Sequence, residues 1–154
     1  MASADLNELY NDAIGLAQHM LLSHGEFIPF GVSMDMSGSV AQVAGDLRTE
    51  HPTSAEMVAF LQASFEQQAH QGSIRAAGVC IDMYVLPPGR EQKSDAICVR
   101  LAHISGEDAE VFVPYTHDNN GAFQLESAFA QAGGSFRLLS PNNSFKPKPL
   151  CGSA

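Results

Sequence analysis

Three runs of alternating apolar and polar residues between positions 74 and 115 constrain the fold more than any other feature of this chain. The runs cover residues 74–86, 95–104 and 109–115. Alternation with a period of two is typical of strands that bury one face. A Pro-Pro-Gly break at 87–89 separates the first two runs, and a polar turn at 105–108 separates the last two. Because short connections join antiparallel neighbours, the sequence predicts a three-stranded antiparallel meander.

Two helices are predicted before the meander. Thr53 and Glu56 have the spacing of a capping box, and apolar residues follow at helical spacing until Gly72. Residues 5–23 carry a second apolar stripe at helical spacing, and Gly25 offers a stop after it. We therefore expect one helix at the start of the chain and one directly before the meander.

The remaining segments predict a hairpin and a short third helix. Residues 27–36 alternate like a half-buried strand, Ser37-Gly38 suits a tight turn, and residues 40–47 can return as the partner strand. Apolar residues within 123–132 have helical spacing and precede two glycines, so a third helix is predicted there. Residues 136–139 could add a last strand.

These elements predict an α+β fold in the order α-β-β-α-β-β-β-α. A single antiparallel sheet of about five strands with packed helices would bury every apolar face. Roadblock-like and profilin-like domains share this order of elements, which makes them an analogy for the architecture. The 154 residues fit one domain, predicted at 1–140. From Pro141 the chain is rich in Pro, Asn, Ser and Lys, so residues 141–154 are predicted to be an extended or flexible tail.

The chain is acidic, with 17 Asp and Glu against 8 Lys and Arg and a formal net charge of -9. Such a surface repels phosphate backbones and anionic lipid headgroups, so neither nucleic acid nor a membrane is expected as a partner. The acidity either keeps the protein soluble or favours a basic protein partner.

The sequence predicts a cytoplasmic protein. Residues 1–5 lack the basic region and apolar stretch of a secretory signal. No apolar run approaches the roughly 20 residues that span a bilayer. The cysteines, Cys80, Cys98 and Cys151, are odd in number and widely spaced, which makes a disulfide framework unsuitable.

Four residues are candidates for a binding site. His24 and Glu26 follow the first predicted helix, where they could share a proton or bind a metal, or where His24 could simply complete the negative end of the helix. Lys93 and Asp95 flank Ser94 at the start of a predicted strand. A Ser–Lys pair could support nucleophilic chemistry, or these residues could have only a role at a strand edge. We predict that the turn at His24 and Glu26 lies near the start of the Asp95 strand.

Other titratable residues have structural interpretations as well as functional ones. Asp35 and Asp82 lie within predicted strands, where Arg75 and Arg100 could donate to them. Histidines and a carboxylate elsewhere could bind a metal, but their spacing fits no known ligand pattern: His103, His117 and Asp118. No nucleophile elbow or glycine-rich phosphate loop occurs, so no catalytic residue, metal or cofactor is predicted.

Three segments resemble the signature of a family of small soluble bacterial proteins. They read SHGEFIPFG at residues 23–31, KSDAI at 93–97 and VFVPY at 111–115. The resemblance covers roughly residues 6–115. It implies a bacterial cytosolic protein, and it implies no particular activity.

Three functions remain open at the level of sequence. The preferred one is a non-catalytic binding or protein-interaction module, of adaptor or immunity type, working as a homodimer or with another protein. The second is a small enzyme using His24, Glu26, His103 or His117, with or without a metal. The third is a small-molecule sensor whose ligand lies between sheet and helices.

Overall fold

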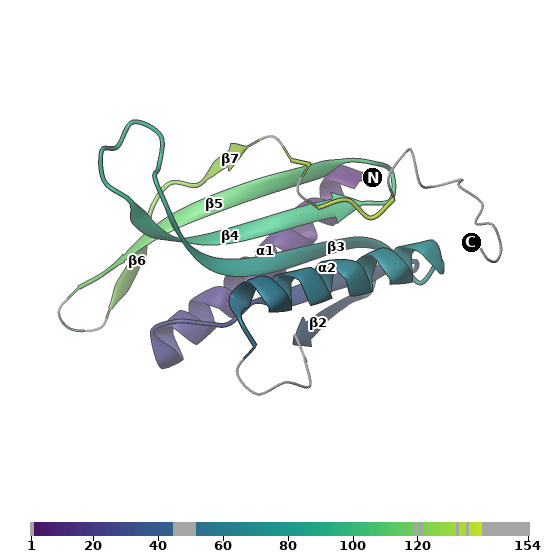
Figure 1. The fold of residues 1–154 in the computed structure, drawn as a ribbon, viewed down its shortest axis with the longest axis horizontal. Coiled ribbons are helices and arrows are strands. Elements are labelled where there is room, and N and C mark those ends of the chain that lie inside the picture. The colour runs from purple at the N-terminus through teal and green to yellow at the C-terminus, as the bar shows by residue number, and fades with distance from the viewer. Residues whose placement is uncertain are drawn as a thin grey trace.

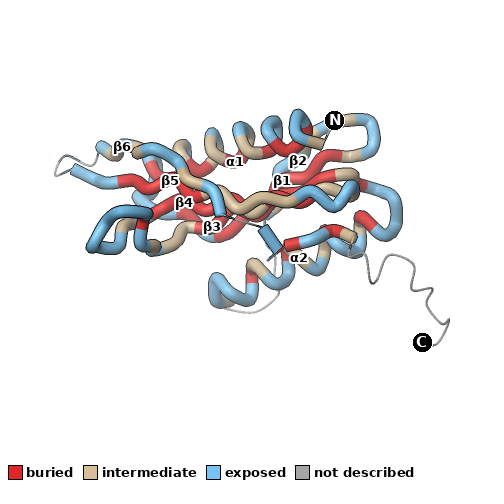
Figure 2. The backbone as a smooth tube through the Cα atoms, turned by 90° about the horizontal axis from the view of Figure 1, so that it is seen from above, coloured by how far each residue is buried: buried red, intermediate tan, exposed pale blue. Residues whose placement is uncertain are grey.

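The computed structural model describes residues 2–44, 52–118, 120, 122–131, 133–134 and 136–139. Two helices and one open antiparallel sheet make up this part of the chain (Figure 1). Seen along the sheet, the first helix covers one face and the second helix covers the other (Figure 2). The α+β class and the single sheet are therefore confirmed. The predicted tail, 141–154, and residues 45–47 of the predicted second strand lie outside the described residues.

The first helix, α1 (Ala2–His24), buries one stripe of side chains against the sheet. The stripe recurs at helical spacing and includes Leu9, Ala13 and Ala17, all with 0% exposure. The helix packs on β1, β3 and β4. It ends as predicted at Gly25, whose φ of 80° is readily adopted only by glycine.

The second helix, α2 (Ser54–His70), begins at the predicted capping box. The Thr53 hydroxyl accepts from the Glu56 amide at 3.1 Å, and the Glu56 carboxylate accepts from the Thr53 amide at 2.8 Å. Leu61 and Phe65 are fully buried against the sheet. Gly31 lets this helix approach closely, because a Cβ there would lie 2.5 Å from the Phe65 ring.

Five long strands carry the sheet, in the spatial order β2-β1-β3-β4-β5. They are β1 (Phe30–Asp35), β2 (Val40–Ala44), β3 (Ile74–Val85), β4 (Ser94–His103) and β5 (Asp108–His117). The predicted hairpin and meander are both present, joined by pairing of β1 with β3. Alternation along each strand sends side chains to the two faces in turn. Two cores result, one under α1 and one under α2.

The predicted third helix is wrong. Residues 123–131 form two short strands, β6 (Phe123–Leu125) and β7 (Phe129–Gln131), which both pair with β5. The free edge of β5 offers unpaired backbone groups, and pairing there satisfies more of them than an isolated short helix could. The sheet therefore has seven strands instead of about five.

The predicted last strand at 136–139 is also wrong. These residues form no strand; Phe136 and Leu138 instead bury their side chains in the core under α2. The Phe136 ring lies 6.4 Å from the Phe65 ring. This segment therefore covers part of the sheet that α2 leaves open.

Candidate functional site

The sheet extends past the last turn of α1 and leaves part of its face open to solvent. Because α1 leads directly into β1, its C-terminal end lies beside the start of β1 and β4 and the ends of β3 and β5. We call this end of the molecule the open end. A groove of about 490 Å³ lies there. It is lined by residues of β3, β4, β5 and the β3–β4 connection: Tyr84, Arg90, Gln92, Lys93, Ser94, Asp95, Tyr115, Thr116 and His117.

A buried tyrosine–carboxylate pair lies beside this groove. The Tyr115 hydroxyl donates to Asp82 Oδ1 at 2.6 Å, and Tyr115 is only 3% exposed. Burial raises the pKa of Asp82, and hydrogen bonds from Tyr115 and from the Phe27 amide oppose this rise. Burial, together with the Asp82 carboxylate, raises the pKa of Tyr115 well above its ordinary value. The tyrosine therefore stays protonated and acts as a donor.

The structure brings three of the four predicted site residues to this pair or to the groove. The carboxylates of Glu26 and Asp95 are near enough to Asp82 and Tyr115 to raise the pKa of both groups. Lys93 lines the groove together with Asp95. The turn after α1 and the start of β4 therefore lie at the same end of the sheet.

His24 is placed differently. It is exposed in the last turn of α1, where a cation is favourable at the negative end of the helix. Among the contacts of the described residues, none joins His24 to the groove. The geometry therefore favours a structural role for His24, at the negative end of the helix.

Sequence reasoning missed the aromatic group beside Asp95. His117 and Phe123 lie edge-on around Tyr115, with ring centroids 5.4 Å and 6.3 Å from it. Tyr115 and His117 are two residues apart and so share a face, which the sequence could have shown. Phe123 was assigned to a helix, and its place became known only through its pairing with His117.

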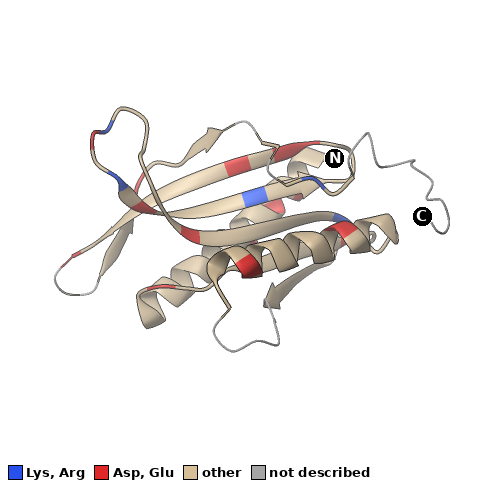
Figure 3. Ribbon diagram, viewed as in Figure 1, with Lys and Arg blue, Asp and Glu red and all other residues tan. Residues whose placement is uncertain are grey.

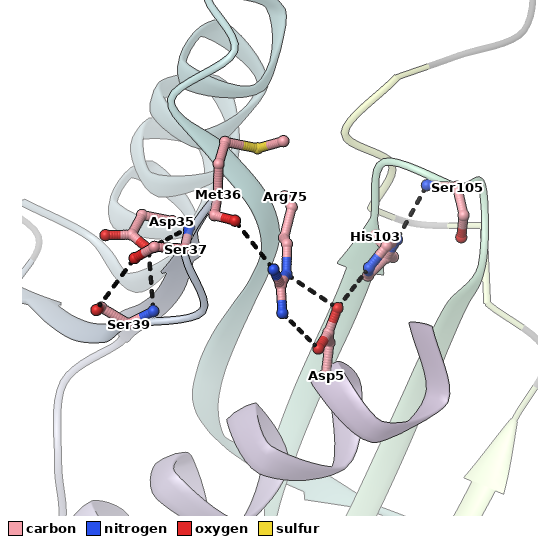
Figure 4. Close-up of polar contacts among 8 residues, drawn as sticks. All are labelled: Asp5, Asp35, Met36, Ser37, Ser39, Arg75, His103 and Ser105. Atoms are coloured by element: carbon pink, nitrogen blue, oxygen red, sulfur yellow. Dashed lines mark hydrogen bonds and ion pairs between the residues drawn. The ribbon is translucent and has the colours of Figure 1, made fainter. Parts of the chain in front are cut away.

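A second polar cluster lies at the opposite end of the sheet (Figure 4). Asp5, in the first turn of α1, accepts from Arg75 Nε at 3.1 Å and from Arg75 Nη2 at 3.0 Å. It also bonds His103 Nε2 at 2.9 Å. The Ser105 amide donates to His103 Nδ1 at 3.0 Å, so the imidazole proton lies on Nε2 and points to Asp5. This cluster holds the start of α1 to β3 and β4.

The predicted partners of Asp35 and Asp82 are wrong. Arg75 pairs with Asp5, and Arg100 pairs with Glu110 at 2.9 Å. Asp35 instead accepts from the Ser37 and Ser39 amides in the β1–β2 turn, each at 2.9 Å. Hydrogen bonds from Ser37 and Ser39 lower the pKa of that carboxyl.

One of the residues considered for a small enzyme, His103, does not lie at the groove. His103 lies at the far end of β4 from Asp95, about 25 Å away along the strand at its usual rise per residue. Among the described residues, no three His, Cys, Asp or Glu side chains are grouped to hold a metal ion.

Neither of the two described helices has the combination of length and apolar character that crossing a membrane requires. Basic positions are sparse along the described chain, and acidic ones are spread over both helices and the sheet (Figure 3). No protein-family model, no curated protein and no solved structure matches this chain. The bacterial family and the roadblock-like and profilin-like analogy therefore stay predictions.

Proposed function

We propose that this protein is a non-catalytic interaction module that binds a basic protein partner at its open end. The observation that carries the proposal is the distribution of exposed apolar side chains. Among the described residues, six large apolar side chains are exposed. Four of the six lie at the open end: Leu22, Ile28, Tyr84 and Leu86, which are 54–68% exposed.

Exposed apolar side chains gathered in one region are typical of interaction surfaces, whereas scattered ones are ordinary. Leu22 lies in the last turn of α1 and Ile28 in the connection to β1. Tyr84 lies near the end of β3 and Leu86 just after it. An exposed tyrosine is among the side chains that most often anchor a partner, since it buries a large area at little entropic cost.

The charge at this end supports a basic partner. Glu26 is exposed beside Ile28, and Asp95 is exposed in the groove. Within the described residues, neither carboxylate has an ion pair. Lys93 at the same end forms none either, and each of the four described arginines is paired elsewhere: Arg75, Arg90, Arg100 and Arg137. Two copies of a chain with net charge -9 repel one another, so a second copy fits this end less well than a basic partner does.

An array of synthetic peptides of about 15 residues, varied at basic and apolar positions, tests the proposal. Peptides that combine Lys or Arg with an aromatic or branched apolar residue should bind, and acidic versions of the same peptides should not. Tyr84→Ser should weaken binding at least about tenfold, because truncating an anchor costs more than 1 kcal/mol. Phe60→Ser is the matched control, since Phe60 is also exposed but lies on α2.

Two results would overturn the proposal. One is equal binding by Tyr84→Ser and Phe60→Ser proteins. The other is a dimer, measured by light scattering, that dissociates on Tyr84→Ser substitution, because this would assign the open end to a second copy of the chain.

A further inference from the structure

The groove at the open end has the size of a small-molecule site. Its volume of about 490 Å³ lies within the range of roughly 300–1,000 Å³ that is usual for ligand pockets. It lies on the sheet face that α1 covers elsewhere, beyond the last turn of that helix. The partner surface proposed above shares Tyr84 and the Asp95 carboxylate with the groove.

Two side chains of opposite charge stand on one wall of the groove. Lys93 immediately precedes β4 and Asp95 is its second residue, so both point to the same side of the extended chain. Two residues of strand separate their Cα atoms by about 6.6 Å. Both residues are exposed, and among the described residues neither forms an ion pair with the other or with a third group.

The unpaired state of Lys93 contrasts with that of the described arginines. Every described arginine has a carboxylate partner: Arg75, Arg90, Arg100 and Arg137. Arg90, which also lines the groove, is held by Glu126. The groove therefore presents one unpaired cation beside one unpaired anion to solvent.

An aromatic group completes the groove. The ring of Tyr115 lies beneath it, and its hydroxyl is already committed to Asp82. The His117 ring stands edge-on to Tyr115 at 5.4 Å and lines the same groove. Ring faces and edges offer an apolar contact next to the two charges.

We propose that the groove binds a small zwitterion with a free ammonium group and a free carboxylate, of the amino-acid or dipeptide type. Asp95 accepts hydrogen bonds from the ammonium group, and Lys93 donates to the carboxylate. The apolar part of the ligand rests against the exposed His117 ring, which packs edge-on against the buried Tyr115 ring. Because both charges are exposed to water, each contributes modestly, and the dissociation constant is expected to be on the order of 0.1–1 mM.

Four probes test this on the full chain by NMR titration of backbone amides. L-phenylalanine and phenylalanyl-glycine carry both charges, phenethylamine lacks the carboxylate, and 3-phenylpropionate lacks the ammonium group. At least one of the two zwitterions should shift the amides around Lys93, Asp95 and His117. It should bind at least about fivefold more tightly than either single-charge analogue, and whichever zwitterion binds better identifies the ligand type.

Two substitutions of exposed side chains test which protein charge binds which charged group of the ligand. Asp95→Asn should remove the advantage of the zwitterion over 3-phenylpropionate, and Lys93→Met should remove its advantage over phenethylamine. Glu66→Gln, which removes an exposed charge from α2, should change neither. Far-UV circular dichroism checks that each variant is folded.

The proposal is overturned if phenethylamine binds as tightly as the better-binding zwitterion, since the groove would then be a cation site. It is equally overturned if neither zwitterion shifts these amides at 10 mM. Neither result bears on the partner surface, whose test depends on Tyr84 and not on Lys93 or Asp95.

Discussion

Replacing Asp5 by Asn removes the charge on which the polar cluster at the start of α1 depends. Asp5 is 8% exposed and binds Arg75 through two nitrogens and His103 through a third. An asparagine offers one acceptor oxygen and presents its own amide protons to the remaining donors. The variant therefore keeps the shape of the side chain and loses most of its bonds.

The expected loss of stability is about 2–4 kcal/mol. Breaking a fully buried ion pair by removing one partner costs roughly 3–5 kcal/mol. The Arg75 side chain is 29% exposed, so water can solvate part of the abandoned guanidinium, which lowers the expected cost by about 1 kcal/mol from that range. For a chain of this length, such a loss lowers the melting temperature by roughly 5–15 °C.

Urea unfolding followed by far-UV circular dichroism measures the effect, since the chain has no Trp for fluorescence. Asp12→Asn is the control on the same helix, because Asp12 bonds only the exposed Gln42 amide, at 3.1 Å, among the described contacts. The control should stay within about 0.5 kcal/mol of the parent protein. A loss below 0.5 kcal/mol for Asp5→Asn, or an equal loss for both variants, would refute the reasoning.

The pH dependence gives a second check on Asp5. The hydrogen bond from His103 and the Arg75 guanidinium lower the pKa of this carboxyl below its ordinary 3.8, against the effect of burial. Its contribution is then present above pH 3.8 and is lost as the pH falls through the folded-state pKa. The stability difference between parent and Asp5→Asn should shrink below about pH 3.8.

Three further predictions concern the packing and the buried titratable groups. Gly31→Ala should cost about 1–3 kcal/mol in urea unfolding, because the new Cβ meets the buried Phe65 ring at 2.5 Å; Gly15→Ala, which meets nothing within 4 Å, should not destabilise. Asp82→Asn should raise the melting temperature by about 1–2 °C at pH 7, since burial raises the pKa of this half-buried carboxyl and its ionised form destabilises the fold. The gain should vanish below pH 3.8, where the carboxyl is protonated. A lower melting temperature at pH 7 would contradict this prediction. Cys98 should resist alkylation at pH 8 in the native protein and react in urea, as burial raises its thiol pKa to about 12; peptide mass spectrometry reads this out.

The candidate site was partly visible in the sequence. Lys93 and Asp95 stood out as polar residues at the start of an apolar strand, and the structure puts both in the groove. Tyr115 was counted only as the end of a strand, although its hydroxyl bonds Asp82 from 33 residues away. That contact depends on the register of β3, β4 and β5, which no local pattern specifies.

The sequence by itself determined the helices and strands that are specified by local residue patterns. The capping box fixes where α2 starts, because its two hydrogen bonds join residues three apart. Alternation with a period of two predicts the long strands, since it reports only which face is buried.

Only the tertiary structure decided the features that depend on distant neighbours. Residues 123–131 became strands because β5 offers an open edge, although their own apolar spacing favours a helix. Asp5 binds Arg75 and His103, which lie 70 and 98 residues further along the chain, so only folding brings these partners to it. Strand pairing and the burial of a charge both require partners that folding brings close together. These partners are distant in sequence, so a local pattern of residues does not show them.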